Sequence, residues 1–202
     1  MGRPSNTEER RTQIVEGLLH AMAEHGYDRA SVHAIADKAG LAPGLVHYHF
    51  KNKQEILLSL ITHLGVLLSE RYERRAKAAG SPRARLYAFL DAHVALGSDA
   101  HPAAVACWVG IGAVAVRDPE VRIAFRDAMK RNVEQVEVHV RAVLDDEGRA
   151  TSAVKDIAAG LVATIHGCYQ LSTVPNAAPR GFAAPTVRRI ADGLIAAQPE
   201  AT

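Results

Sequence analysis

Apolar residues recur at steps of three and four along this chain, and this spacing constrains its fold more than any other feature. Between residues 7 and 25 the recurrence places Ile14, Leu18 and Met22 in one stripe along a helix. No segment alternates apolar and polar residues as a half-buried strand does. Aromatic residues make up only 5% of the chain, and alanine and valine dominate the apolar set. We therefore predict an all-α fold.

Glycines and prolines divide this pattern into about nine helices. Gly26 and Gly40 end the first two, and Pro43 begins a short third helix. After a long fourth helix, the break at residues 80–82 starts a second series of helices. These later helices are expected at about residues 82–97, 102–116, 119–147, 151–172 and 185–197. We predict a small domain at residues 1–53 and a larger helical domain at residues 54–202.

Composition excludes several classes of protein. Cys107 and Cys168 are too few for a disulfide framework and lack the spacing of a zinc site, so we expect no metal and a reducing, cytoplasmic location. The polar N-terminus resembles neither a signal peptide nor a lipidation motif. The longest apolar run, residues 103–116, is too short to span a bilayer. The formal net charge of +2 does not identify a partner, and no cofactor is expected.

Two short helices meet across a tight glycine turn in the first domain. Ser31 is placed to cap the first of them, which ends at Gly40, and Pro43 opens the second. Val46 and Phe50 lie four residues apart on the second helix, which is too short to be stable alone. We expect these two side chains to anchor it while its other face stays exposed. This arrangement predicts a helix-turn-helix.

The segment SVHAIADKAGLAPGLVHYHFKNKQE, residues 31–55, closely resembles the N-terminal domain of the TetR family of transcriptional regulators. The resemblance implies an N-terminal three-helix DNA-binding domain whose recognition helix enters the major groove. Two positions depart from the family pattern, because Ala42 stands where a capping Ser is usual and His47 where Tyr is usual. An operator sequence therefore cannot be transferred from relatives.

The resemblance also indicates which residues contact DNA. Tyr48, His49 and Lys53 are expected at phosphates, whereas Gly44 and Leu45 are expected close to base edges. Arg3 is expected to reach a minor groove. For Lys53 taken alone, a solvated lysine is an equally good interpretation. The complete predicted set is Arg3, Ser31, His33, Pro43, Gly44, Leu45, His47, Tyr48, His49 and Lys53.

The larger domain resembles the family's ligand-binding and dimerisation domain, and residues 106–108 and 160–169 resemble its choline- and betaine-responsive branch. Trp108, Tyr87 and Tyr169 could together form a cage for a quaternary amine. Core packing is the alternative role for Trp108, and an apolar, neutral or lipid-like effector remains open. The predicted ligand contacts are Tyr87, His93, Cys107, Trp108, Phe125, Met129, His166 and Tyr169.

The last two helices carry apolar rows that the resemblance assigns to a homodimer interface. A two-fold dimer presents two recognition helices to successive major grooves, so the expected partner is a double-stranded, pseudo-palindromic operator. We predict a one-component repressor that a small-molecule effector releases from DNA. The predicted interface residues are Ile157, Leu161, Ile165, Ile190 and Leu194.

The sequence carries little that favours an enzyme or a metal-binding protein. No phosphate-binding loop, nucleophile elbow or Cys/His pair of usable spacing indicates an enzyme. His47 and His49 point in different directions around a helix, so a metal chelate there is improbable. A ligand-insensitive dimeric DNA-binding protein and an activator on the same fold remain as alternatives.

Overall fold

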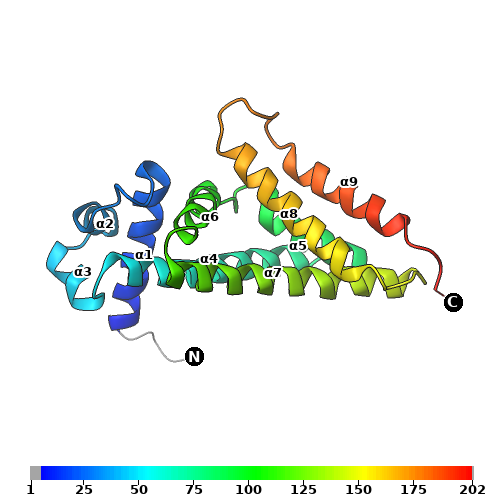
Figure 1. Cartoon of the computed structure of the whole chain (residues 1–202), viewed down its shortest axis with the longest axis horizontal. Coiled ribbons are helices and arrows are strands. Elements are labelled where there is room, and N and C mark those ends of the chain that lie inside the picture. Colours follow the sequence, from blue (N-terminus) through cyan, green and yellow to red (C-terminus); the bar gives the residue numbers. More distant parts are fainter. Residues whose placement is uncertain (1–5, 202) are drawn as a thin grey trace. The chain divides into compact units, whose positions relative to one another are not determined.

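The computed structural model describes residues 6–201, and the elements of this part of the chain are nine helices without a strand (Figure 1). One isolated bridge joins Arg149 to Glu200. The all-α prediction is therefore confirmed. The helices are α1 (Asn6–His25), α2 (Val32–Ala39), α3 (Pro43–His49), α4 (Lys53–Ala76), α5 (Pro82–Val94), α6 (Pro102–Ala115), α7 (Pro119–Asp146), α8 (Val154–Ser172) and α9 (Ala183–Ala196).

The described residues form two compact units, and each is treated by itself. Unit 1 comprises the residues up to Val66 together with His101–Ala128, and unit 2 comprises Leu67–Ala100 and the residues from Met129 onward. The boundary predicted at residues 53 and 54 thus falls inside unit 1. The physical reason is that α6, although distant in sequence, packs on α1, where the Cys107 thiol donates to the Leu19 carbonyl oxygen at 3.3 Å.

Unit 1 is built on close packing of α1 against α2. The apolar stripe of α1 is buried, including Ile14, Leu18 and Met22. Gly17 allows the two helices to approach closely, since a Cβ atom there would stand 2.5 Å from the Ile35 carbonyl oxygen. Gly40 ends α2 with φ of 65°, a left-handed conformation that glycine adopts without strain.

Unit 2 is built from α5, α8 and α9, which pack against one another; α8 and α9 lie side by side in Figure 1. Its ion pairs are partly buried. Asp91 is buried and binds the Arg188 guanidinium, and Arg75 binds Asp99 at 2.8 Å. Such charges are tolerated inside a protein because each is paired and hydrogen-bonded.

Helix α5 ends at Val94, whereas the sequence pattern continues to residue 97. The buried Arg71 explains this difference. Its guanidinium donates to the carbonyl oxygens of Ala92 and Ala95, and its Nε atom lies 3.2 Å from Asp99. Arg71 therefore satisfies carbonyl groups that a helix end leaves without partners, so the chain can turn there. Within residues 6–201, no helix combines the length and the apolar character needed to cross a membrane.

Candidate DNA-binding surface and effector site

Helix α3 has one buried and one exposed face. Val46 and Phe50 are only 1% and 2% exposed, as predicted for the two anchors. Tyr48 is 80% exposed and Leu45 is 40% exposed. Pro43 is the first residue of the helix. Ala42 before it provides no side-chain cap, because a methyl group cannot accept a hydrogen bond. The two buried anchors thus hold α3 in place, while its exposed side chains present hydrogen-bonding and apolar groups to solvent.

Arg11 of α1 fixes the end of α3, which the sequence analysis did not foresee. Its guanidinium donates to the His49 carbonyl oxygen and lies 3.9 Å above the centre of the Phe50 ring. It also binds Glu55 at 3.3 Å. Glu55 accepts the Lys51 backbone N–H at 2.8 Å, and this bond lowers the pKa of the carboxyl group. No local motif reveals this network because Arg11 is distant in sequence from its partners.

The remaining predicted DNA contacts lie on α3 itself and at the start of α2. Gly44, His47, Ser31 and His33 are exposed, whereas Pro43 and His49 are half-buried. The Ser31 hydroxyl oxygen accepts the Ala34 backbone N–H at 3.2 Å, so its own proton remains available to donate. The predicted contact of Arg3 falls outside the described residues.

Lys53 is held at the start of α4. Its ammonium group donates to the Tyr27 carbonyl oxygen at 2.8 Å and lies 3.4 Å from that of Asp28. It also lies 4.3 Å from the centre of the Tyr27 ring. An ammonium group has three N–H donors, so one remains after two carbonyl contacts. Partial burial lowers the pKa of Lys53.

Three of the predicted effector residues lie together in unit 2. The Nδ1 atom of His93 lies 2.9 Å from the Tyr169 hydroxyl, and the rings of His166 and Tyr169 are 5.3 Å apart. Phe89, His139 and Tyr72 extend this group of rings at centroid distances of 5.0 to 5.4 Å, although the sequence analysis did not select them. We call these six residues the ring cluster.

Two ring nitrogens of this cluster have no hydrogen-bond partner within residues 6–201. Among the described residues, neither the Nε2 atom of His93 nor that of His139 has a hydrogen-bond partner, and both atoms are buried. Burial, with smaller contributions from the nearby charges of His166 and Arg71, lowers the pKa of His93 to about 3. Burial also lowers the pKa of His139 and raises that of Tyr169. The cluster is therefore uncharged near neutral pH and has unused hydrogen-bonding capacity.

The other predicted effector residues lie elsewhere. Trp108 is buried and packs on Phe125 in unit 1, with ring centroids 5.8 Å apart. Cys107 beside it is also buried, which raises the pKa of its thiol to about 12. Met129 lies half-buried on α7. Tyr87 donates to Asp192 at 2.6 Å, and the Arg188 guanidinium lies 5.0 Å from its ring centre. The structure therefore differs at Tyr87 from the predicted cage for a quaternary amine, because the Arg188 guanidinium already lies against that ring.

The predicted dimer interface needs a correction. Ile157, Leu161 and Ile165 are buried inside the single chain, so they cannot face a second copy. The apolar periodicity of α8 marked its core face. Ile190 is 36% exposed and Leu194 is half-buried. The exposed side of α8 carries Ala159, Gly160, Ala163 and Gly167.

One cavity is lined by none of the predicted effector residues. It lies in unit 1 and has a volume of about 810 Å³. Within the described part of the chain, no three His, Cys, Asp or Glu side chains are grouped closely enough to hold a metal ion.

Comparison with known proteins identifies the family to which this chain belongs. Residues 14–60 match the bacterial regulatory proteins of the tetR family, and residues 82–198 match the C-terminal part of BetI-type transcriptional repressors. The HTH-type transcriptional regulator BetI of Rhizobium meliloti (strain 1021) is 30% identical over 83% of this chain and 80% of its own length. The fatty acid metabolism regulator protein of Bacillus subtilis (strain 168) is 32% identical, over 46% of this chain and only 48% of its own length.

Solved structures share the fold. A transcriptional regulator from Saccharomonospora viridis, crystallised in complex with choline, matches with a TM-score of 0.76 and 22% identity over 94% of this chain and 97% of that one. A TetR-family regulator from Rhodococcus sp. matches with a TM-score of 0.76 and 19% identity over the same shares. The family consists of transcriptional regulators, which confirms that the chain is not an enzyme. This chain belongs to the TetR family of bacterial transcriptional regulators and carries a C-terminal domain of the BetI-type repressors.

Proposed function

We propose that this regulator binds a pseudo-palindromic operator as a homodimer, represses transcription there and is released by a small-molecule effector. The two-faced character of α3 is the observation that carries the DNA-binding step. Phe50 and Val46 anchor the helix through its buried face, while Tyr48 and Leu45 are exposed to solvent. A helix held in this way can enter a major groove without losing its own packing.

The exposed groups have separate roles in this proposal. Tyr48, His49 and Lys53 bind phosphates, together with Ser31, His33 and Arg3, and fix the position of the helix on the duplex. Gly44 and Leu45, with Pro43 and His47 beside them, approach base edges. The Lys53 ammonium suits a phosphate because it is oriented by the Tyr27 and Asp28 carbonyl groups and keeps one N–H donor.

The effector is proposed to bind at the ring cluster of unit 2. His93, His166 and Tyr169 supply the polar contacts, and the two partnerless Nε2 atoms are groups that a ligand would satisfy. The choline complex of the Saccharomonospora viridis regulator supports a quaternary amine as the ligand class. The remaining predicted contacts, Tyr87, Cys107, Trp108, Phe125 and Met129, stay proposals.

The second copy is proposed to pack on the exposed face of α8, with Ile190 and Leu194 of α9 at its margin. Gly160 and Gly167 have open space around them, so a helix of the partner could approach the backbone closely. Ala163, which lies between these glycines, is also small and leaves room for the same close approach.

A selection of genomic DNA fragments by the purified protein tests the proposal, followed by mobility-shift titration of the best fragment at fixed salt. We expect a pseudo-palindrome bound at nanomolar concentration. Tyr48→Phe should weaken binding to every sequence, whereas Leu45→Ala should change the preferred bases. Binding that is weak and independent of sequence would contradict the proposal. Added choline should release the selected fragment, and no release would refute that effector.

A further inference from the structure

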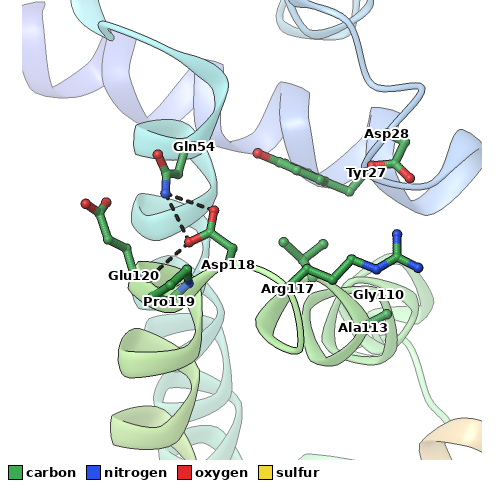
Figure 2. A pocket seen from close by; sticks show the side chains of 10 residues that line it. Tyr27, Asp28, Gln54, Gly110, Ala113, Arg117, Asp118, Pro119 and Glu120 are labelled. Carbon is green, nitrogen blue, oxygen red and sulfur yellow. Dashed lines mark hydrogen bonds between the residues drawn. The ribbon is translucent and has the colours of Figure 1, made fainter.

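Figure 2 shows the cavity of unit 1 with the side chains that line it. Its walls come from the turn after α1, the first turn of α4, the end of α6 and the start of α7. At about 810 Å³ it has the size of pockets that hold small organic molecules. Neither the operator contacts nor the proposed effector site uses this space.

Negative charge predominates around this cavity. Asp28, Asp118 and Glu120 contribute three carboxylates to its lining, against the single guanidinium of Arg117. Within residues 6–201 none of these carboxylates forms an ion pair with a lysine or arginine. Partial burial, together with the charges of Asp118 and Asp28, raises the pKa of Tyr27, which also lines the cavity. Among the described residues, the carboxylates of the wall outnumber its cations, and the Lys53 ammonium is the cation that interacts with Asp28 electrostatically.

Two features define what kind of cation would fit. The carboxylates are not grouped closely enough to share one metal ion. The end of α6 contributes the small, largely apolar surface of Gly110, Ala113 and Val114 to the same lining. A ligand that matches both features has separated positive charges joined by an apolar chain.

The polar groups of the wall have fixed positions. Gln54 donates to both oxygens of Asp118, at 2.9 and 3.1 Å, as the dashed lines of Figure 2 show. Asp118 also accepts the backbone N–H groups of Glu120 and Val121 at the start of α7. These bonds hold the carboxylate in place, and the N-terminus of α7 offers it only a partial positive charge. An ammonium group beside Asp118 would supply a full positive charge.

We propose that this cavity is a second ligand site of the regulator and that it takes an aliphatic diamine or polyamine. One ammonium group binds Asp28 at the edge of the Tyr27 ring, and the other binds Asp118 and Glu120. The aliphatic chain lies along Ala113 and Val114. The Tyr27 and Asp28 carbonyl groups also hold Lys53, so a diamine bound here touches the turn that orients a proposed phosphate contact.

Isothermal titration of the full-length protein with putrescine tests this site, with n-butylamine, butanediol and succinate as comparison ligands at constant ionic strength. Because an exposed ion pair contributes up to ~1 kcal/mol, equivalent to about fivefold, putrescine should bind about fivefold tighter than n-butylamine. Butanediol and succinate should bind more weakly still. No binding of putrescine, equal affinity for the monoamine, or tighter binding of succinate would overturn the proposal.

Variants locate the ligand. Asp28→Asn and Glu120→Gln each remove one proposed anchor, and both side chains are exposed and form no hydrogen bond or ion pair among the described residues. Each should weaken putrescine binding about two- to fivefold, and the double variant about tenfold. Asp145→Asn on the exposed surface of α7 is the matched control and should leave the affinity unchanged. Ala113→Trp should block the cavity and abolish binding. Retained affinity in the double and Ala113→Trp variants, with circular dichroism showing an intact fold, would refute this location.

Discussion

At the scale of single residues, Lys53 is held by its own chain and keeps one N–H donor for the phosphate contact proposed for it. Two backbone carbonyl groups and the Tyr27 ring orient its ammonium group, and these contacts restrict a side chain that is otherwise highly mobile. Holding the charge in one place reduces the entropy lost when it meets a phosphate. The interpretation of Lys53 as a merely solvated lysine does not account for these contacts.

Lys53→Ala should therefore weaken binding to all DNA sequences alike. Removal of one phosphate contact should reduce the slope of log affinity against log salt concentration by about one. Mobility-shift titrations across a salt series measure this slope. Lys77→Ala, at an exposed position in the turn that follows α4 in unit 2, is the control and should leave it unchanged. An unaltered slope for Lys53→Ala would show that the ammonium group does not contact a phosphate.

His93 predicts a pH dependence of stability. The folded protein keeps this ring neutral down to about pH 3, whereas an unfolded chain takes up the proton near the ordinary value of 6.5. Between these values the unfolded state binds more protons, so the free energy of unfolding is at its full value above about pH 6.5 and falls as the pH is lowered. His139 and His166, whose pKa values burial also lowers, act in the same direction.

Urea unfolding at a series of pH values measures this effect. Replacing His93 by Gln should reduce the slope of unfolding free energy against pH by up to about 1.4 kcal/mol per pH unit, the effect of one proton. His101→Gln changes an exposed histidine and should leave the slope as in the wild type. The slope is informative even if His93→Gln lowers stability throughout. Identical slopes for His93→Gln and wild type would contradict the neutral buried state.

At the scale of helices, the sequence predicted what is local and missed what is distant. The ends of α2 and α3 follow from Ser31, Gly40 and Pro43, because caps and turns depend on neighbouring residues. The Arg71 contacts that end α5 join residues far apart in the chain, so no local pattern contains them. For the same reason, no local pattern indicated that Arg11 binds the end of α3.

Periodicity also has a limit that α8 illustrates. An apolar row shows which face of a helix avoids water, but it does not say whether the same chain or a second copy covers that face. Ile157, Leu161 and Ile165 are covered by their own chain. Likewise, an aromatic residue in an apolar helix fits a protein core and a ligand pocket equally well. The sequence pattern therefore could not distinguish Trp108, which packs on Phe125, from Tyr169 in the ring cluster.

Gly17 tests the packing of α1 on α2. In Gly17→Ala, the new Cβ atom would stand 2.5 Å from the Ile35 carbonyl oxygen and 3.0 Å from the Ala39 Cβ atom. One of the helices must move, and overpacking of this kind costs about 1–3 kcal/mol. Gly65→Ala on α4 meets nothing within 4 Å and should instead stabilise the protein by about 0.5–1 kcal/mol. Urea unfolding of both variants should show opposite signs, and a stabilised Gly17→Ala protein would contradict this packing.

At the scale of the whole molecule, the distribution of the helices between the two units bears on regulation. Helix α6 belongs to the unit of the recognition helix, and α4 and α7 each contribute residues to both units. A ligand at the proposed ring cluster would therefore touch both of these helices, since Tyr72 lies on α4 and His139 on α7. Because binding free energies are linked, any factor by which an effector weakens DNA binding must equal the factor by which DNA weakens effector binding.

The proposed dimer is the feature on which operator recognition depends, and α8 offers a direct test of it. Ala163→Glu places a carboxylate on the exposed small-residue face, where it would have to lose its water against the second copy. Sedimentation velocity should show a shift from dimer to monomer. Affinity for a complete pseudo-palindrome should then fall to that for a single half-site, since a monomer carries only one recognition helix.

Ala142→Glu introduces the same charge on an exposed position of α7 and controls for charge alone, so it should leave both properties unchanged. Circular dichroism separates loss of dimer from loss of fold, because Ala163 is exposed in the single chain and its replacement disturbs no core contact. A fully dimeric Ala163→Glu protein would place the interface elsewhere. If both variants became monomeric, the interface would have to include α7 as well. Only separation of the two variants supports a second copy on α8.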